Sequence, residues 1–64
     1  MGKVRRAGYV FFTWKSDHAP RHVHVYRDWV LVVKCDLDHR LVMKGEAPER
    51  LLRLIRKLES EGLL

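Results

Sequence analysis

Two histidines in the stretch PRHVHVY (residues 20–26) are the side chains whose type and spacing best suit chemistry. His22 and His24 alternate with Val23 and Val25, and residues two apart in a strand lie on the same face about 7 Å apart. The valines would then face a core. Four interpretations follow: a metal site, an acid–base pair, a binding surface, or only the polar side of a strand.

A metal site would use both imidazoles, because two histidines on one strand can reach the same ion. The third ligand would come from Asp17, His18 or Asp36. The surrounding segment is basic and poor in carboxylates, which counts against this interpretation. We therefore expect no cofactor.

An acid–base pair would suit a metal-independent ribonuclease, because histidine titrates near neutrality and two of them can share the roles of base and acid. His22 and His24 would then be the catalytic residues. Such an enzyme also needs cations that hold the phosphate and stabilise the transition state. The basic residues closest in sequence are Lys15, Arg21 and Arg27.

Binding without catalysis requires the same face of the strand. Histidine and tyrosine rings, together with aromatic side chains of the preceding strand and rimmed by arginine, would stack the bases and neutralise the phosphates of RNA, or receive an acidic protein. The candidate binding residues belong to the strand and to the loop before it: Lys15, Asp17, His18, Arg21, Tyr26 and Arg27.

The positive charge of the chain is unevenly distributed. The 64 residues carry a net charge of +5. Residues 1–27 hold six basic side chains and one acidic side chain, whereas residues 28–64 hold seven of each. Localised positive charge favours polyanions, although a small charge surplus also serves solubility.

The single cysteine limits the possible stabilising chemistry. Cys35 cannot form an internal disulfide or supply a cysteine-based metal cluster alone, and a lone cysteine fits a reducing compartment. No apolar run is long enough for a signal peptide or a bilayer span. We expect a cytoplasmic protein that does not enter a membrane.

The strands and the helix that must position the histidines are expected to form an α+β fold in a single domain, residues 1–64. Apolar and alternating patterns predict strands at 8–15, 21–26, 29–36 and 40–44. Their short connections predict an antiparallel meander of three or four strands. Leucines and an isoleucine at helical spacing predict one C-terminal helix at about 48–61, packed on one face of the sheet.

The C-terminal helix gives three further expectations. Gly62 suits the left-handed position after a helix, with Leu63 returning to Leu58 in a Schellman motif. The cations of the outer helix face should be partly neutralised by glutamates of the same helix; they are Arg50, Arg53, Arg56 and Lys57, with Glu49, Glu59 and Glu61. One helix leaves the other sheet face uncovered and apolar, so we expect a homodimer or a constitutive partner.

Three segments together resemble the bacterial domain of unknown function 4160 family: RAGYVFFTWKSDHAPRHVHVY, LVVKCDL and MKGEAPERLLRLIRKLESEGLL. The aromatic strand and the PxHVHV signature of that family fall on Tyr9, Phe11, Asp17, His18, Pro20, His22 and His24. Two positions depart from the family pattern. Arg21 stands where many members have a second proline, and Trp29 stands where the hairpin usually has glycine.

The resemblance implies a small component of a toxin–antitoxin-like module with a protein partner encoded nearby. It also raises the expectation of an RNA-directed activity. It does not imply an enzyme, and it does not choose between a protein and RNA as the ligand.

Overall fold

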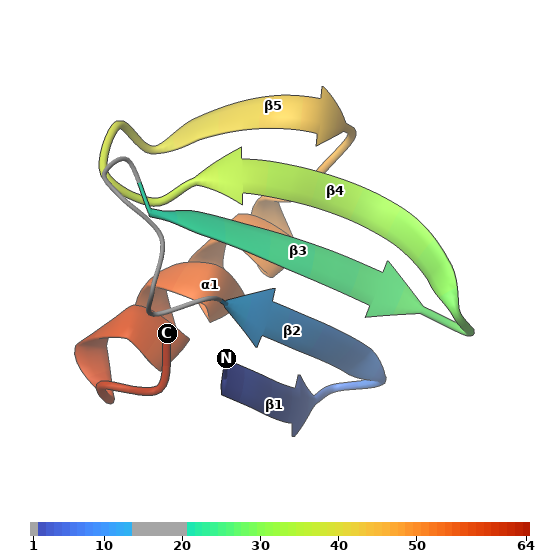
Figure 1. The fold of residues 1–64 in the computed structure, drawn as a ribbon, viewed down its shortest axis with the longest axis horizontal. Coiled ribbons are helices and arrows are strands. Elements are labelled where there is room, and N and C mark those ends of the chain that lie inside the picture. The colour runs from blue at the N-terminus through green and yellow to red at the C-terminus, as the bar shows by residue number, and fades with distance from the viewer. Residues whose placement is uncertain (1, 14–20) are drawn as a thin grey trace.

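A five-stranded antiparallel sheet with one helix on one face forms the fold (Figure 1). The computed structural model describes residues 2–13 and 21–64. The spatial order of the strands is the chain order, as in a meander. The elements are β1 (Gly2–Arg6), β2 (Tyr9–Thr13), β3 (His22–Arg27), β4 (Val30–Asp36), β5 (Leu41–Gly45) and α1 (Glu49–Ser60). The α+β class is therefore as predicted, but the predicted count of three or four strands is wrong.

The strand that the sequence did not predict is β1. Its only large apolar residue is Val4, and the rest of the strand is glycine, lysine and arginine, so no hydrophobic pattern marks it. It pairs with β2 through a two-residue turn at Ala7 and Gly8, both of which have positive φ. Such a turn matches the twist of a hairpin, which explains how a basic edge strand is held in register.

The hydrophobic core lies between the sheet and α1. Val23 and Val25 of β3 are fully buried, as their alternation with the histidines predicts. The core cluster comprises Tyr9, Phe11, Val23, Val25, Val33, Cys35, Leu37, Leu51, Ile55 and Leu58. Burial raises the pKa of the Cys35 thiol, which keeps it protonated as a small apolar core residue.

The C-terminus of α1 has the predicted Schellman geometry. The N–H of Leu63 donates to the carbonyl of Leu58 at 3.0 Å, and the N–H of Gly62 donates to Glu59 at 3.0 Å. Gly62 has a φ of 77°, which glycine adopts without strain. No helix in residues 2–13 and 21–64 is long and apolar enough to cross a membrane.

The sheet face away from α1 differs from the apolar patch expected from the sequence. The missed strand β1 contributes Lys3 and Arg5 to this face, since they lie opposite Phe12 and Val10. Large apolar residues are exposed in the β3–β4 hairpin, at Trp29 and Val30, and on the other edge strand, β5, at Leu41, Val42 and Met43. Pairing with β1 therefore adds cations to a face that also carries Val10 and Phe12, and the partner expected on this face stays a prediction.

Candidate nucleic-acid interface

The two histidines project from the sheet face that α1 leaves uncovered. His22 and His24 alternate with the buried valines of β3, and His24 lies opposite Phe12 on β2 and Lys34 on β4. We call this surface the open face. Its members used below are Lys3, Arg5, Val10, Phe12, His22, His24, Tyr26, Lys34 and Lys44.

Aromatic rings occupy the middle of the open face. The rings of Phe12 and Tyr26 meet edge to face, with centroids 5.5 Å apart and an interplanar angle of 89°. The ammonium group of Lys3 lies 5.9 Å from the Phe12 ring centroid, within cation–π range. The rings are half-buried, so each presents some surface to solvent.

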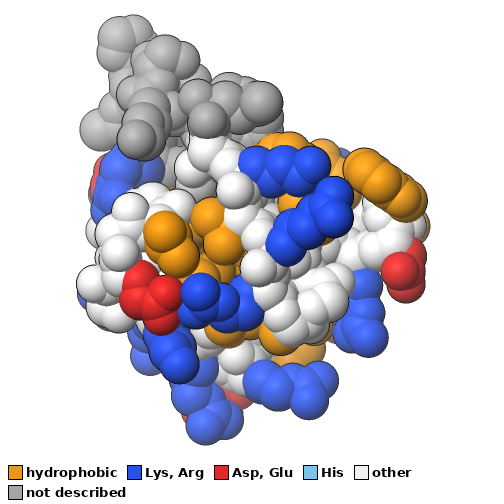
Figure 2. Space-filling model, turned by 90° about the horizontal axis from the view of Figure 1, so that it is seen from below, with side chains coloured by type: hydrophobic (Ala, Val, Ile, Leu, Met, Phe, Trp, Pro, Cys, Tyr) orange, Lys and Arg blue, Asp and Glu red, His pale blue; other side chains and the backbone are white. Residues whose placement is uncertain are grey.

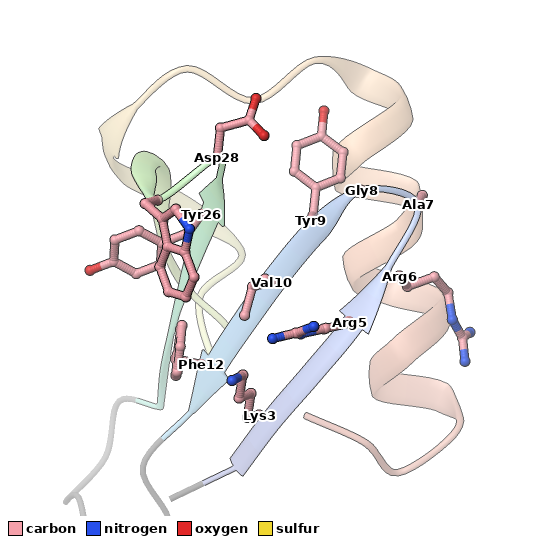
Figure 3. Close-up of a pocket in the computed structure, with 11 residues that line it drawn as sticks. Lys3, Arg5, Arg6, Ala7, Gly8, Tyr9, Val10, Phe12, Tyr26 and Asp28 are labelled. Carbon is pink, nitrogen blue, oxygen red and sulfur yellow. The ribbon is translucent and has the colours of Figure 1, made fainter.

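Cations frame these rings from three strands. Lys3 and Arg5 come from β1, and Lys34 and Lys44 come from β4 and β5. Figure 3 shows Lys3 and Arg5 pointing over β2 toward Val10 and Phe12, whereas Arg6 points away from them. Among the described residues, none of the four open-face cations forms an ion pair with a carboxylate. Within the described part of the chain, these charges are therefore not neutralised by an acidic side chain.

A groove of about 500 Å³ lies at one end of the open face, where the β1–β2 and β3–β4 turns meet. We call it the end groove (Figure 3). Its lining combines the cations Lys3 and Arg5 with the rings of Phe12, Tyr26 and Trp29, and it also includes the acidic residue Asp28. Trp29 is 84% exposed and has a φ of 66°, a rare conformation for a bulky residue. An exposed indole at this position is available to stack on a ligand.

The metal interpretation gains no support from the described part of the chain. No group of three or more metal-binding side chains is present among those residues. Asp36 is the cross-strand partner of His22, but its carboxylate accepts the N–H groups of Asp38 and His39 at 3.0 Å. The other candidate ligands, Asp17 and His18, and the candidate binding residue Lys15 lie outside the described residues.

The acid–base interpretation is restricted by which ring atoms are accessible. Nε2 of His22 and Nδ1 of His24 are both buried. A general acid or base must come within hydrogen-bond reach of its substrate. A ribonuclease would therefore have to use the opposite nitrogen of each ring.

Arg21 is held by carboxylates. Its Nε donates to Asp38 Oδ1 at 2.8 Å and its backbone N–H donates to Oδ2 at 2.9 Å. A second guanidinium nitrogen donates to Glu59 of α1 at 3.4 Å. The hydrogen bond to Asp38 raises the pKa of Arg21 and, reciprocally, lowers the pKa of Asp38. This arginine ties β3 to the β4–β5 turn and to the helix, so its charge is already compensated.

Arg27 lies on the helix side of the sheet. Its guanidinium carbon is 5.5 Å from the ring centroid of Tyr9, a core residue. The structure thus brings Tyr26 together with the histidines and separates Arg27 from them. The sequence placed aromatic side chains of the first strand, such as Phe12, on the binding face, but it missed five other residues of the site: Lys3, Arg5, Trp29, Lys34 and Lys44. The signal that could have found four of them is the alternation of charge in KVRR and around Lys34 and Lys44.

The fold and the site together define a small α+β protein whose helix-free sheet face is both basic and aromatic. Residues 8–61 of the 64-residue chain match the family described as Domain of unknown function (DUF4160), and the chain belongs to that family. This confirms the resemblance drawn from the sequence. Neither the curated proteins nor the solved structures contain a significant match to the chain.

Proposed function

We propose that the protein binds single-stranded RNA on the open face and in the end groove. The observation that carries this proposal is the position of aromatic rings between cations that have no carboxylate partner among the described residues. Exposed rings of this kind stack on bases, and the surrounding cations neutralise phosphates.

The aromatic rings come from the central strands and the turn that follows them. Phe12 and Tyr26 come from the adjacent strands β2 and β3, and Trp29 from the turn after β3. An antiparallel sheet with aromatic residues on neighbouring strands is a recurring platform for unpaired bases. Because every base has a π face, stacking alone predicts weak sequence preference.

Lys34 and Lys44 place two positive charges side by side on the open face. They are direct cross-strand partners, and like charges at such positions destabilise a sheet. A phosphate between them would remove this repulsion. RNA as the ligand also fits the cytoplasmic location expected from the sequence.

The test is a two-dimensional NMR titration of the labelled protein with a single-stranded 8-nucleotide uridine oligomer. We expect shifts on the open face and an affinity that falls by about 50-fold between 50 and 200 mM salt, if about four phosphates are neutralised. The double variant Lys3→Gln/Arg5→Gln should reduce this salt dependence by about half.

The matched control is Arg40→Gln/Arg56→Gln. It removes the same charge from the groove between β5 and α1, away from the open face. If the two double variants weaken binding equally, net charge alone explains the attraction and the open face is not the site. If the parent protein shows no shifts at low salt, RNA binding is excluded.

The second candidate function is binding of a protein partner, as expected of a toxin–antitoxin-like component. The exposed apolar residues of β5 favour it: Leu41, Val42 and Met43 are 60%, 42% and 49% exposed on an edge strand with unpaired backbone groups. Such an edge can add a strand from another chain. The expected homodimer would use this edge, and sedimentation should then give a mass of two chains that Val42→Lys reduces to one.

Cleavage of RNA by His22 and His24 is not part of the proposal. If it occurs, it should continue in EDTA and be lost in His22→Ala without unfolding. A metal site on the same pair would instead shift both histidine resonances at one equivalent of zinc.

A further inference from the structure

A second cationic groove lies on the helix side of the sheet and is not used by the proposed function. It has a volume of about 450 Å³ and lies among the β1–β2 turn, the end of β3 and α1. We call it the helix groove. Its lining includes Ala7 and Tyr9 together with four cations, Arg27, Arg50, Arg53 and Lys57.

The cations of the helix groove are not neutralised by the acids of α1. The sequence predicted a pair between Glu49 and Arg53, but no such ion pair is present in the described residues. The glutamates near the end of α1 form ion pairs with cations outside the helix groove. Both carboxylate oxygens of Glu61 accept a hydrogen bond from Arg6 at 3.0 Å, and Glu59 pairs with Arg21. The predicted Glu49–Arg53 ion pair is therefore absent, and the two other glutamates form their ion pairs away from the helix groove.

Three of these cations form a stripe along α1 because of their spacing in the sequence. Arg50, Arg53 and Lys57 are separated by three and four residues, so they lie on one side of α1. Arg56 falls on another side and lines the groove beside β5. Arg27 extends the stripe onto the sheet, where its guanidinium lies over the ring of Tyr9. Four exposed cations without a carboxylate partner in the described residues attract a polyanion.

The helix groove is continuous with the end groove. Both are lined by Ala7 and Tyr9, so the β1–β2 turn is their common border. Figure 2 shows the molecule from below, where Lys and Arg side chains are prominent over much of the surface. A flexible anionic chain leaving the end groove over Ala7 would therefore meet Arg27 and then the helix cations.

We infer that the helix groove binds the phosphate backbone of the RNA strand whose bases lie on the open face. This inference rests on the proposed function. It makes the preferred ligand a strand long enough to pass from the open face, over the β1–β2 turn, onto α1. The helix groove supplies charge and a single core-bound ring, so it contributes affinity for phosphates rather than recognition of bases.

The experiment compares 4-nucleotide and 12-nucleotide uridine oligomers, a range that spans the site sizes of small single-strand binding folds. The variant is Arg50→Gln/Arg53→Gln, with Arg40→Gln/Arg56→Gln as the control of equal charge. Glutamine has nearly the helix propensity of arginine, so α1 should be retained. We expect the helix-groove variant to reduce the salt slope for the 12-mer by about 1.4, and to leave the 4-mer unchanged.

Three outcomes separate the two proposals. If the 12-mer binds the helix-groove variant with the affinity and salt slope of the control, the inference is overturned. If Lys3→Gln/Arg5→Gln has no effect on either oligomer while the helix-groove variant still weakens the 12-mer, phosphate binding in the helix groove stands and the open-face proposal fails. If neither oligomer binds the parent protein, both proposals are overturned.

Discussion

Lys34 on β4 and Lys44 on β5 lie directly opposite each other on the open face. A β-bulge follows this pair, where the register shifts between Lys34 and Cys35. Neither lysine forms an ion pair among the described residues. Sheet stability alone would favour an opposite charge at one of the two positions, so this arrangement sacrifices stability in favour of a local positive potential.

Replacing Lys44 should therefore stabilise the protein while weakening RNA binding. Lys44→Gln removes the repulsion, and we expect the free energy of unfolding to rise by about 0.5 kcal/mol. Urea denaturation measures this change. The salt slope for the 8-nucleotide oligomer should fall by about 0.7, since one phosphate contact is lost.

Lys3→Gln is the control for this pair. Lys3 lies opposite Phe12 rather than a cation, so its replacement loses a cation–π contact and relieves no repulsion. It should lower the salt slope without raising stability. A Lys44→Gln protein that is less stable than Lys3→Gln would contradict the proposed repulsion.

Trp29 should contribute to binding without contributing to stability. Trp29→Gly removes an indole that is 84% exposed and relieves a left-handed conformation. The relief of strain offsets the greater unfolded-state entropy of glycine, so the free energy of unfolding should stay within about 1 kcal/mol. The affinity for RNA should fall about tenfold, because loss of one stacked base costs about 1–3 kcal/mol.

Ala7→Gly provides a matched control at the neighbouring hairpin. Ala7 also has positive φ, at 54°, but carries no ring. This variant should keep the affinity of the parent protein. If Trp29→Gly binds RNA as tightly as Ala7→Gly does, the indole is not a stacking partner.

Local sequence patterns predicted those parts of the fold that depend on nearest neighbours. The alternation around Val23 and Val25 predicted which face of β3 is buried, and the spacing of Gly62 and Leu63 predicted the end of α1. Both depend on residues within a few positions of each other. The family resemblance was likewise carried by contiguous segments.

The remaining features depend on contacts between distant residues. β1 has almost no apolar residues of its own and is fixed by pairing with β2, so the alternation in KVRR hints at a strand but does not show which sheet face receives its charge. Arg21 was expected to bind a ligand, but its partners lie 17 and 38 residues away at Asp38 and Glu59. Sequence spacing does not reveal such pairs, because the register of a sheet determines them.

The network around Arg21 predicts how stability depends on pH. Burial raises the pKa of Asp36, but hydrogen bonds from His39 and Asp38 outweigh it and hold the pKa below its usual value. Arg21 holds the pKa of Asp38 below its usual value as well. Carboxylates with lowered pKa values stabilise the fold above their unfolded pKa of about 3.9, and this stabilisation is lost as the pH falls through the folded values.

Asp38→Asn should therefore lower the stability of the protein at pH 7. It should also reduce the amount of stability that the protein loses when the pH is lowered. Urea midpoints at pH 7 and pH 3 measure both effects. Asp28→Asn is the control, since Asp28 lies in the β3–β4 turn at the other end of the sheet. The interpretation fails if Asp38→Asn loses as much stability between the two pH values as the parent protein and the control do.

Gly45 should be the glycine whose replacement costs most, because it fixes the pairing that positions Lys44. Its φ is 82°, and a Cβ built there would collide with the backbone carbonyl of Val32. Gly62 has a similar φ, but a Cβ there meets nothing within 4 Å. Gly62→Ala should cost about 1 kcal/mol from the left-handed backbone alone, whereas Gly45→Ala should cost about 3 kcal/mol because the strands must also separate. Urea denaturation compares the two variants. Equal losses in the free energy of unfolding would contradict the prediction, because they would show that β4 and β5 separate at this position at no additional cost. The NMR spectrum of Gly45→Ala should show its largest changes at Val33 and Lys34, the residues that pair with Gly45 and Lys44.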